Sequence, residues 1–141
     1  MPMTVSVIIP TYNRAGLLPR AIKSVLSQSL TDLEVIVVND ASTDATVSVV
    51  EELRKTDSRI KLITNQVNQY PDISKTINIG LTGASGRYIA RLDDDDYWCD
   101  RDKLKKQVAF LEAHPDHVLV GSGMIVVNEH DKELYRFLKK E

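Results

Sequence analysis

The stretch RLDDDDYW, residues 91–98, places four consecutive carboxylates directly after the short apolar run YIARL, residues 88–92. Two ionised carboxylates about 6 Å apart repel each other by roughly 3 kcal/mol at an effective dielectric constant near 20, so a cation or protonation must offset the charge. Successive side chains of a strand point to opposite faces, so Asp93 and Asp95 would share one face and the other two carboxylates the opposite face. Oxygen ligands of this kind suit a hard divalent ion such as Mg²⁺ or Mn²⁺. A solvated acidic loop is the alternative interpretation.

The composition is that of a single globular domain covering residues 1–141. The chain is 43% hydrophobic and 27% charged, and it is long enough to bury a core of its own. Its apolar runs are all far shorter than the roughly 18 residues of a membrane span. The N-terminal residues 1–10 lack the features of a secretory signal, and Cys99 is the only cysteine. We therefore expect a cytoplasmic location, which includes the inner face of a membrane.

The negative charge is concentrated in one segment. The formal net charge is −2, yet residues 93–102 contain six Asp and one Arg, a local balance of −5 that leaves +3 for the remainder. Nucleic-acid binding normally requires a basic stripe with stacking aromatic residues, so this distribution argues against it. A polyphosphate bridged to the protein by a metal ion fits the distribution better.

Short β-branched runs alternate along the chain with segments of helical periodicity. One helix has Leu17, Leu18, Ala21, Ile22, Val25 and Leu26 on one face, and the next is expected to begin with Ser42 or Thr43 as N-cap and to bury Val47, Val50 and Leu53. We expect strands at residues 5–10, 33–39, 60–64, 88–92 and 117–123, and further helices at about 73–81 and 103–113. Residues 128–141 are left unassigned. Strands separated by helices indicate an α/β fold with a mainly parallel sheet and helices on both faces.

Polar residues follow three of the expected strands. The clusters are residues 11–14, 40–44 and 93–96. In open parallel sheets, ligands bind at the carboxyl ends of the strands where the strand order switches. We therefore expect the three clusters to meet at one rim of the sheet.

Five motifs in this order resemble family 2 glycosyltransferases with the GT-A fold. They are SVIIPTYNR (6–14), EVIVVNDASTD (34–44), INIG (77–80), GRYIARLDDDDYW (86–98) and KLKKQV (103–108). The resemblance runs from about Val5 to Glu112. It implies the Rossmann-like nucleotide-binding half of a GT-A domain, with the acceptor-binding side expected beyond residue 141.

The resemblance implies a base pocket lined by Pro10, Thr11 and Tyr12. It also implies that Asp40 accepts a hydrogen bond from the N3 proton of uracil, and an ionised carboxylate, which only accepts, suits such an edge. Asn39 stands where many relatives have a second Asp, which removes one charge. Ser42 and Asp44 are interpreted as helix-capping groups rather than ligand contacts.

The resemblance further assigns residues 93–95 to the D-x-D element of the family. Asp95 would coordinate Mg²⁺ or Mn²⁺, while Asp93 or Asp94 would contact the ribose or reach the metal through water. Ile77 replaces the common arginine of the family's A-R-N-x-G segment. Lys75 is therefore a candidate for the missing phosphate-binding cation, with a solvated surface lysine as the alternative.

The implied reaction transfers a sugar, with inversion, from a nucleoside diphosphate such as a UDP-sugar to an acceptor hydroxyl. The acceptor would be a glycan or a lipid-linked glycan of cell-surface polysaccharide synthesis, with peripheral membrane association left open. The family's general base lies in the second half of the domain, so no catalytic residue is assigned, and the oligomeric state is also left open. A non-catalytic nucleotide-sugar-binding module is the second hypothesis. A phosphoacceptor receiver domain is the third, but no acidic pair follows the first strand and no Lys-Pro occurs.

Overall fold

The computed structural model describes residues 3–137, which divide into two compact units, Met1–Lys105 and Lys106–Glu141. Each unit is treated by itself. The first contains, in chain order, β1 (Val5–Thr11), α1 (Leu18–Leu26), β2 (Leu33–Asn39), α2 (Thr46–Thr56), β3 (Ile60–Thr64), α3 (Ile73–Thr82) and β4 (Tyr88–Arg91). Helix α4 (Lys103–Ala113) begins in the first unit and ends in the second. The α/β alternation expected from the sequence is confirmed.

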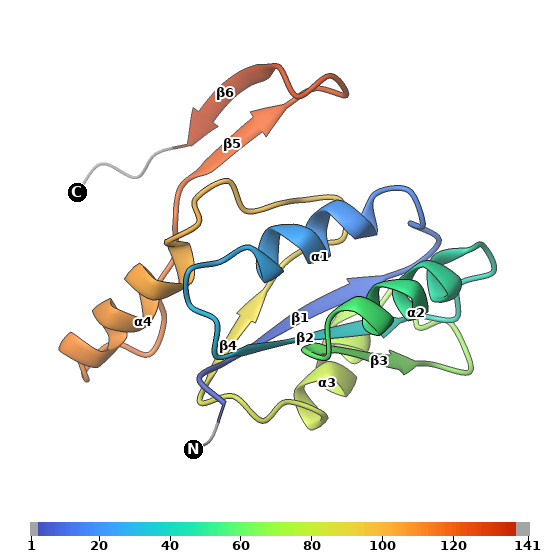
Figure 1. Cartoon of the computed structure of the whole chain (residues 1–141), viewed down its shortest axis with the longest axis horizontal. Helices are drawn as coiled ribbons and strands as arrows, with labels where there is room; N and C mark the ends of the chain where they lie inside the picture. The colour runs from blue at the N-terminus through green and yellow to red at the C-terminus, as the bar shows by residue number, and fades with distance from the viewer. Residues whose placement is uncertain (1–2, 138–141) are drawn as a thin grey trace. The chain divides into compact units, whose positions relative to one another are not determined.

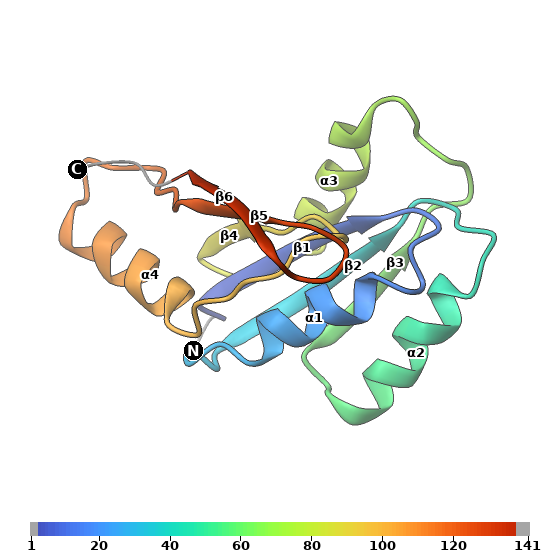
Figure 2. The same cartoon turned by 90° about the horizontal axis from the view of Figure 1, so that it is seen from above.

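A parallel sheet in the order β3-β2-β1-β4 forms the centre of the first unit (Figure 1). Val5 of β1 pairs with Leu33 of β2 on one side and with Tyr88 of β4 on the other. Every residue of β1 and β2 is buried. Figure 2 shows the reason, because α1 and α2 cover one face of the sheet and α3 covers the other. A strand covered on both faces is apolar along its whole length, which explains the continuous hydrophobic runs.

Helix α3 approaches the sheet closely because it carries Gly80. A Cβ atom at this position would lie 2.7 Å from Cγ2 of Ile8 and 2.9 Å from Cγ2 of Val38. Both neighbours are stiff β-branched side chains of buried strands. The glycine of the INIG motif is therefore required by the packing of α3 on β1 and β2.

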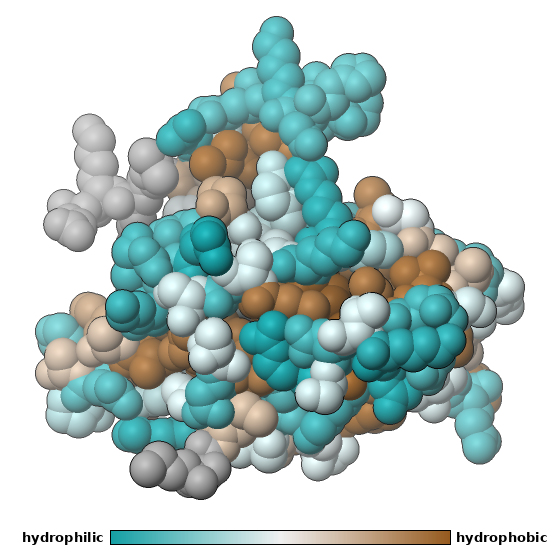
Figure 3. Space-filling view, viewed as in Figure 1, coloured by the Kyte–Doolittle hydropathy of each residue, from teal (hydrophilic) through white to brown (hydrophobic). Residues whose placement is uncertain are grey.

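Two expectations about the helices on the opposite face are corrected. Leu17 precedes α1 and is 47% exposed, because the helix begins one residue later and turns only part of the apolar stretch inward. Helix α2 begins at Thr46, so neither Ser42 nor Thr43 is its N-cap. Hydrophilic side chains cover much of the outer surface over α1 and α2 (Figure 3). The buried side of α1 consists of Leu18, Ala21, Ile22 and Val25.

A buried carboxylate joins the strands at the end opposite the polar rim. Glu34 of β2 is 1% exposed, and its Oε1 accepts hydrogen bonds from Ser6 Oγ (2.5 Å) and from both the amide and the hydroxyl of Ser85 (2.8 Å each). Lys61 Nζ lies 2.5 Å from Oε2. Burial would raise the pKa of Glu34, but the hydrogen bonds from Lys61, Ser6 and Ser85 outweigh it and lower the pKa to about 2.

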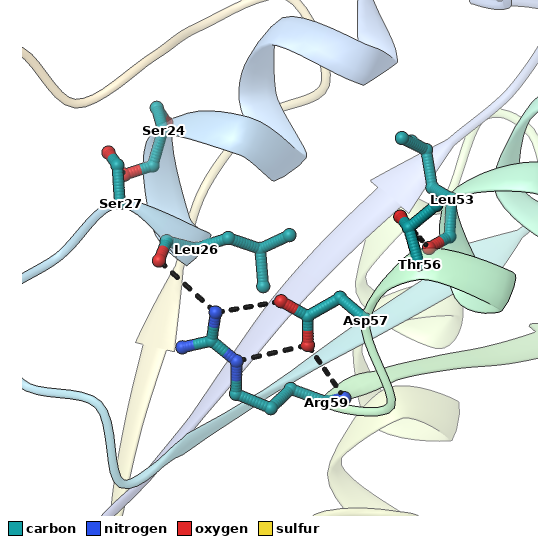
Figure 4. A network of polar contacts seen from close by, with 7 residues as sticks. All are labelled: Ser24, Leu26, Ser27, Leu53, Thr56, Asp57 and Arg59. Carbon is teal, nitrogen blue, oxygen red and sulfur yellow. Dashed lines mark hydrogen bonds and ion pairs between the residues drawn. The ribbon is translucent and has the colours of Figure 1, made fainter.

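The carboxyl end of α1 is capped by an arginine from beyond α2 (Figure 4). Arg59 Nη2 donates to the carbonyl oxygen of Leu26 at 3.2 Å, and its guanidinium is held by Asp57 through bonds of 3.0 and 2.8 Å. A positive charge at this end of a helix is favoured by the helix dipole. This contact fixes α1 to the turn before β3.

The second unit contains an antiparallel hairpin of β5 (Met124–Val127) and β6 (Glu133–Phe137). The expected strand at residues 117–123 is wrong, because this segment has no regular structure and the strand begins only at Met124. Val118 and Leu119 are 96% and 82% exposed, so their apolar character does not reflect burial in a sheet. Hydrophobic side chains are visible on the hairpin in Figure 3. Residues 138–141 of the unassigned tail lie outside the described residues.

Among the helices within residues 3–137, none combines the length and the apolar character needed to cross a membrane.

Candidate functional site

The carboxyl ends of β1, β2 and β4 and the segment after β3 surround a cavity of about 380 Å³ in the first unit. All three rim clusters expected from the sequence contribute to it. The lining residues are Pro10, Thr11, Tyr12, Arg14, Asp40, Asn68, Tyr70, Pro71, Ile73, Thr76, Arg91, Asp93, Asp94 and Asp95. The acidic run and Asp40 therefore belong to the same cavity.

Most of the residues selected from the sequence lie in this cavity. Pro10, Thr11, Tyr12, Asp40 and residues 93–95 all line it. Lys75 is not among the lining residues, and its Nζ lies 3.8 Å from Oδ2 of Asp72 on an exposed part of α3. The ligand contacts of all these residues stay predictions.

Asp40 is held between the strand ends and the segment that follows β3. Its backbone amide donates to the carbonyl oxygen of Thr11 at 2.8 Å. Its carboxylate accepts from Asn65 Nδ2 at 2.7 Å through Oδ1 and from the amide of Gln69 at 2.9 Å through Oδ2. Asn68 Nδ2 donates to the carbonyl oxygen of Asp40 at 3.0 Å. Only 8% of Asp40 is exposed, so the position of its carboxylate is strongly constrained.

The turns after β1 and β2 interlock through their side chains. The side-chain oxygen of Asn13, a residue with a positive φ of 51°, accepts the amide of Thr43 at 2.8 Å. In return, Ser42 Oγ accepts the amide of Asn13 at 2.9 Å. The carboxylate of Asp44 accepts the amides of Ala15 at 3.2 Å and of Thr46 at 2.9 Å. Ser42 and Asp44 thus bind protein backbone and hold two walls of the cavity together.

The pKa values of two carboxylates in the acidic run are raised, mainly by burial. The side chain of Asp94 is 14% exposed, and burial, followed by the charge of Asp95, raises its pKa against the opposing effects of Thr11, Arg14 and the Tyr12 amide. Burial, with the charges of Asp95 and Asp93, also raises the pKa of Asp96. The ionised forms of these two carboxylates are therefore disfavoured first by burial and then by the charges of neighbouring carboxylates.

Two arginines supply positive charge to the site, although neither was assigned a role from the sequence: Arg14 belonged to the expected cluster at residues 11–14, and Arg91 was not placed in the site. Arg14 Nε lies 3.9 Å from Oδ1 of Asp94, and Arg91 Nη2 lies 2.6 Å from Oδ1 of Asp93. Both line the cavity and are half exposed. Arg14 lies in the turn after β1, and Arg91 is the last residue of β4. Their positions near the carboxyl ends of expected strands could have identified both as candidate site residues.

The third wall of the cavity was also missed. It consists of Asn68, Tyr70, Pro71, Ile73 and Thr76, which lie between β3 and the middle of α3. The sequence predicted only a helix at about residues 73–81 there. Its placement depends on the bonds between this segment and Asp40, which sequence periodicity does not reveal.

The segment after the acidic run is fixed to α1. The Trp98 amide donates to Ser24 Oγ at 3.1 Å, and the Arg20 guanidinium lies 3.6 Å from the ring centroid of Tyr97. Gln28 bridges two positions, donating to the carbonyl of residue 100 at 2.9 Å and accepting the Leu104 amide at 3.1 Å. The acidic run is thus anchored on both sides, by β4 before it and by α1 after it.

The carboxylates offer an incomplete set of metal ligands. Within the described residues, no group of three or more His, Cys, Asp or Glu side chains is arranged to hold a metal ion. The oxygen donors of Asp93–Asp95 nevertheless suit Mg²⁺ or Mn²⁺, which commonly take one or two carboxylates and complete their shell with water and substrate phosphates. These donors would therefore suit a metal ion that keeps part of its coordination shell from water or another ligand.

The family model for Glycosyl transferase family 2 matches residues 6–137 of the chain. A GalNAc(5)-diNAcBac-PP-undecaprenol beta-1,3-glucosyltransferase of Campylobacter jejuni is 52% identical over 92 residues, which are 64% of this chain and 29% of that protein. The first curated relatives are 44% and 39% identical, and the chain spans 44% and 38% of their length.

Two solved structures share the fold. Residues 1–349 of TarS from S. aureus in complex with UDP match with a TM-score of 0.73 and 34% identity, covering 80% of this chain and 33% of that one. The mannosyltransferase PcManGT of Pyrobaculum calidifontis, in complex with GDP-Man and Mn²⁺, matches with a TM-score of 0.73 and 30% identity, covering 92% of this chain and 37% of that one.

Proposed function

The chain belongs to glycosyl transferase family 2, and on that premise we propose that its cavity binds a UDP-sugar for transfer of the sugar to an acceptor hydroxyl. The observation that carries the proposal is that Asp40 and Asp93–Asp95 line one cavity on either side of the β1 end. One wall thus offers an acceptor for a base N–H, and the other offers oxygen ligands for a metal. The UDP in the TarS complex supports the choice of nucleotide.

Each part of the nucleotide has candidate partners. Pro10, Thr11 and Tyr12 would pack on the base, and Asp40 would accept its N–H. Asp93 or Asp94 would contact the ribose. Arg14 and Arg91 are better placed than Lys75 to offset the charge of the diphosphate, because both arginines line the cavity.

Asp95, with help from Asp93, would hold Mg²⁺ or Mn²⁺. The metal, when bound, acts as a Lewis acid that neutralises charge on the leaving diphosphate. The Mn²⁺ of the PcManGT complex supports this choice of ion. The chain's own residues would position the donor in the cavity.

The acceptor and the stereochemistry belong to the same proposal. We propose inversion at the anomeric carbon, which requires a general base on the side opposite the leaving group. The undecaprenol in the name of the Campylobacter relative supports a lipid-linked glycan as acceptor. The proposal extends this to cell-surface polysaccharide synthesis at the inner face of the membrane. A flotation assay with undecaprenyl-phosphate vesicles checks the membrane part, and recovery in the protein-only fraction would contradict it.

Titration of the protein with UDP by calorimetry, with and without Mn²⁺, tests the donor site. We expect binding that Mn²⁺ strengthens, and we expect Asp95→Ala to remove this dependence on the metal. Asp116→Ala, at a 79% exposed carboxylate of the second unit, is the matched control. Absence of UDP binding, or binding indifferent to both Mn²⁺ and Asp95→Ala, would reject the proposal.

A donor-binding module without transferase activity is the second candidate. Its basis is that the partners found in the cavity are all assigned to the nucleotide and the metal. Release of UDP from a UDP-sugar by the 141-residue chain would decide for the enzyme. Tight UDP binding without release of product would decide for the module.

A further inference from the structure

We propose that Asn65 is a positioning residue for Asp40, and that this pair selects a nucleobase whose edge presents a ring N–H, such as uracil, over one whose edge presents a ring-nitrogen acceptor, such as cytosine. The inference rests on the proposed function, because it assumes that the cavity holds a nucleotide. It concerns a residue that does not itself line the cavity.

The backbone of Asn65 is fixed by the sheet. Asn65 follows β3 directly, and its amide donates to the carbonyl oxygen of Asn39 at 2.9 Å, which continues the pairing of Asn39 with Thr64. Asp40 comes directly after Asn39, which is the last residue of β2. The two strand ends therefore place Asn65 beside Asp40, and Nδ2 of Asn65 reaches Oδ1 of Asp40 at 2.7 Å.

The carboxylate of Asp40 is held at both oxygens. Asn65 binds Oδ1, and the amide of Gln69 binds Oδ2 at 2.9 Å. A carboxylate has about four lone-pair sites, so each oxygen still has capacity to accept one more hydrogen bond. Two donors on different oxygens prevent rotation about the bond to Cβ, and the carboxyl plane stays fixed relative to the cavity.

A carboxylate with a fixed plane discriminates more strongly between uracil and cytosine than a carboxylate that can rotate. It accepts the N3 proton of uracil, whereas cytosine presents a lone pair at N3 and would be repelled. A carboxylate free to turn could instead accept a proton from the exocyclic amine of cytosine and recover part of the binding. Asn65 does not line the cavity, and its amide is neutral. Its hydrogen bond therefore restrains Asp40 without adding a second charge.

The experiment compares the affinities for UDP and CDP in the presence of Mn²⁺. Calorimetry on the full chain would use the wild type, Asn65→Ala and Asn65→Leu, the last of which keeps the number and branching of the side-chain heavy atoms but lacks the donor. Gln66→Ala changes the exposed neighbouring residue and is the matched control. Circular dichroism checks the fold of each variant, and the leucine variant serves if the alanine variant unfolds.

We expect the wild type to prefer UDP and the ratio of UDP to CDP affinity to fall roughly tenfold in the Asn65 variants, the size of a hydrogen bond to a charged group. The Gln66 control should keep the wild-type ratio. An unchanged ratio in the Asn65 variants, or no preference in the wild type, overturns this inference while UDP binding leaves the proposed function intact. Failure of the wild type to bind UDP at all overturns both.

Discussion

The backbone amide of Asp40 lies 2.8 Å from the carbonyl oxygen of Thr11, so the ends of β2 and β1 are joined by main chain inside the cavity wall. This bond does not involve the carboxylate of Asp40. The side chain can therefore be changed while the bond between the two strand ends is kept.

Asp40→Asn should weaken UDP binding by roughly tenfold to a hundredfold, because it replaces one acceptor oxygen with an amide donor that faces the donors of Asn65 or Gln69. Calorimetry with UDP measures the change. Asp116→Asn, on an exposed carboxylate of the second unit, should bind UDP like the wild type. Wild-type affinity in Asp40→Asn would contradict a role for Asp40 in base recognition.

Glu34→Gln should lower the free energy of unfolding at pH 7 by on the order of 3 kcal/mol, because the pKa of Glu34 falls from 4.5 to about 2 on folding. A lowered pKa contributes stability above pH 4.5 that is lost as the pH falls toward about 2. Urea unfolding at pH 7 and pH 2.5 should therefore show a large difference between wild type and variant at pH 7 and a small one at pH 2.5. Glu129→Gln, with a side chain 79% exposed, is the control for a lost surface charge. Equal losses at the two pH values would contradict the role of the buried carboxylate.

Gly80→Ala should destabilise the protein by about 1–2 kcal/mol, although alanine favours a helix more than glycine does. The added Cβ would lie 2.7 Å from Cγ2 of Ile8, and a stiff core side chain would have to move. Gly16→Ala is the control, because its Cβ would meet nothing within 4 Å. Chemical denaturation measures both, and a gain in stability for Gly80→Ala would show that the contact relaxes at no cost.

Asn13→Gly should lower both stability and UDP affinity, the first by about 1–2 kcal/mol. Glycine tolerates the positive φ of 51° but lacks the oxygen that binds the Thr43 amide, so the effect isolates the hydrogen bonds from the backbone conformation. Asn13→Asp keeps an acceptor and should restore most of both quantities. Thermal unfolding and calorimetry measure them, and an Asp variant no better than the Gly variant would speak against this account.

Arg14→Gln should reduce the affinity for UDP roughly fivefold and leave the affinity for uridine unchanged, because a half-exposed arginine gives a modest charge interaction with phosphate. Arg54→Gln removes an exposed arginine of α2 that pairs with Glu51 and should change neither affinity. Parallel titrations with UDP and uridine measure the difference. Equal losses for the two ligands would assign Arg14 to the base rather than to the diphosphate.

The fold was largely predictable because strands that are buried on both faces appear in the sequence as short, nearly continuous apolar runs. The run from Leu33 to Asn39 was predicted with the bounds that the structure has. The strand predicted at residues 117–123 was wrong because a short apolar run does not reveal whether other elements cover it. The N-cap of α2 was misplaced because Ser42 binds the turn after β1, whereas Asp44 binds both that turn and the amide of Thr46, the first residue of the helix.

The cavity was predictable only where its residues directly follow a strand. Asp40 and the acidic run occupy such places, and both line the cavity. Asn65 also follows a strand, but its importance lies in a contact with a residue 25 positions earlier, which no local pattern encodes. Tyr70 and Thr76 reach the cavity because the segment that carries them is tied to Asp40, and that tie becomes visible only in three dimensions.

Strand β1 lies between β2 and β4 in the sheet. During synthesis its partner β2 is made soon after it, whereas its other partner β4 is made only after α2, β3 and α3. The side of the cavity that contains Thr11 and Asp40 belongs to strands made early, whereas the acidic run follows β4, the last strand of the first unit to leave the ribosome. Pairing of Val5 with Tyr88 closes a long loop, so it is the entropically demanding step of folding. A nascent chain that has not yet docked β4 has only the part of the cavity that β1, β2 and the segment after β3 provide, and the cavity is complete only when the sheet is complete.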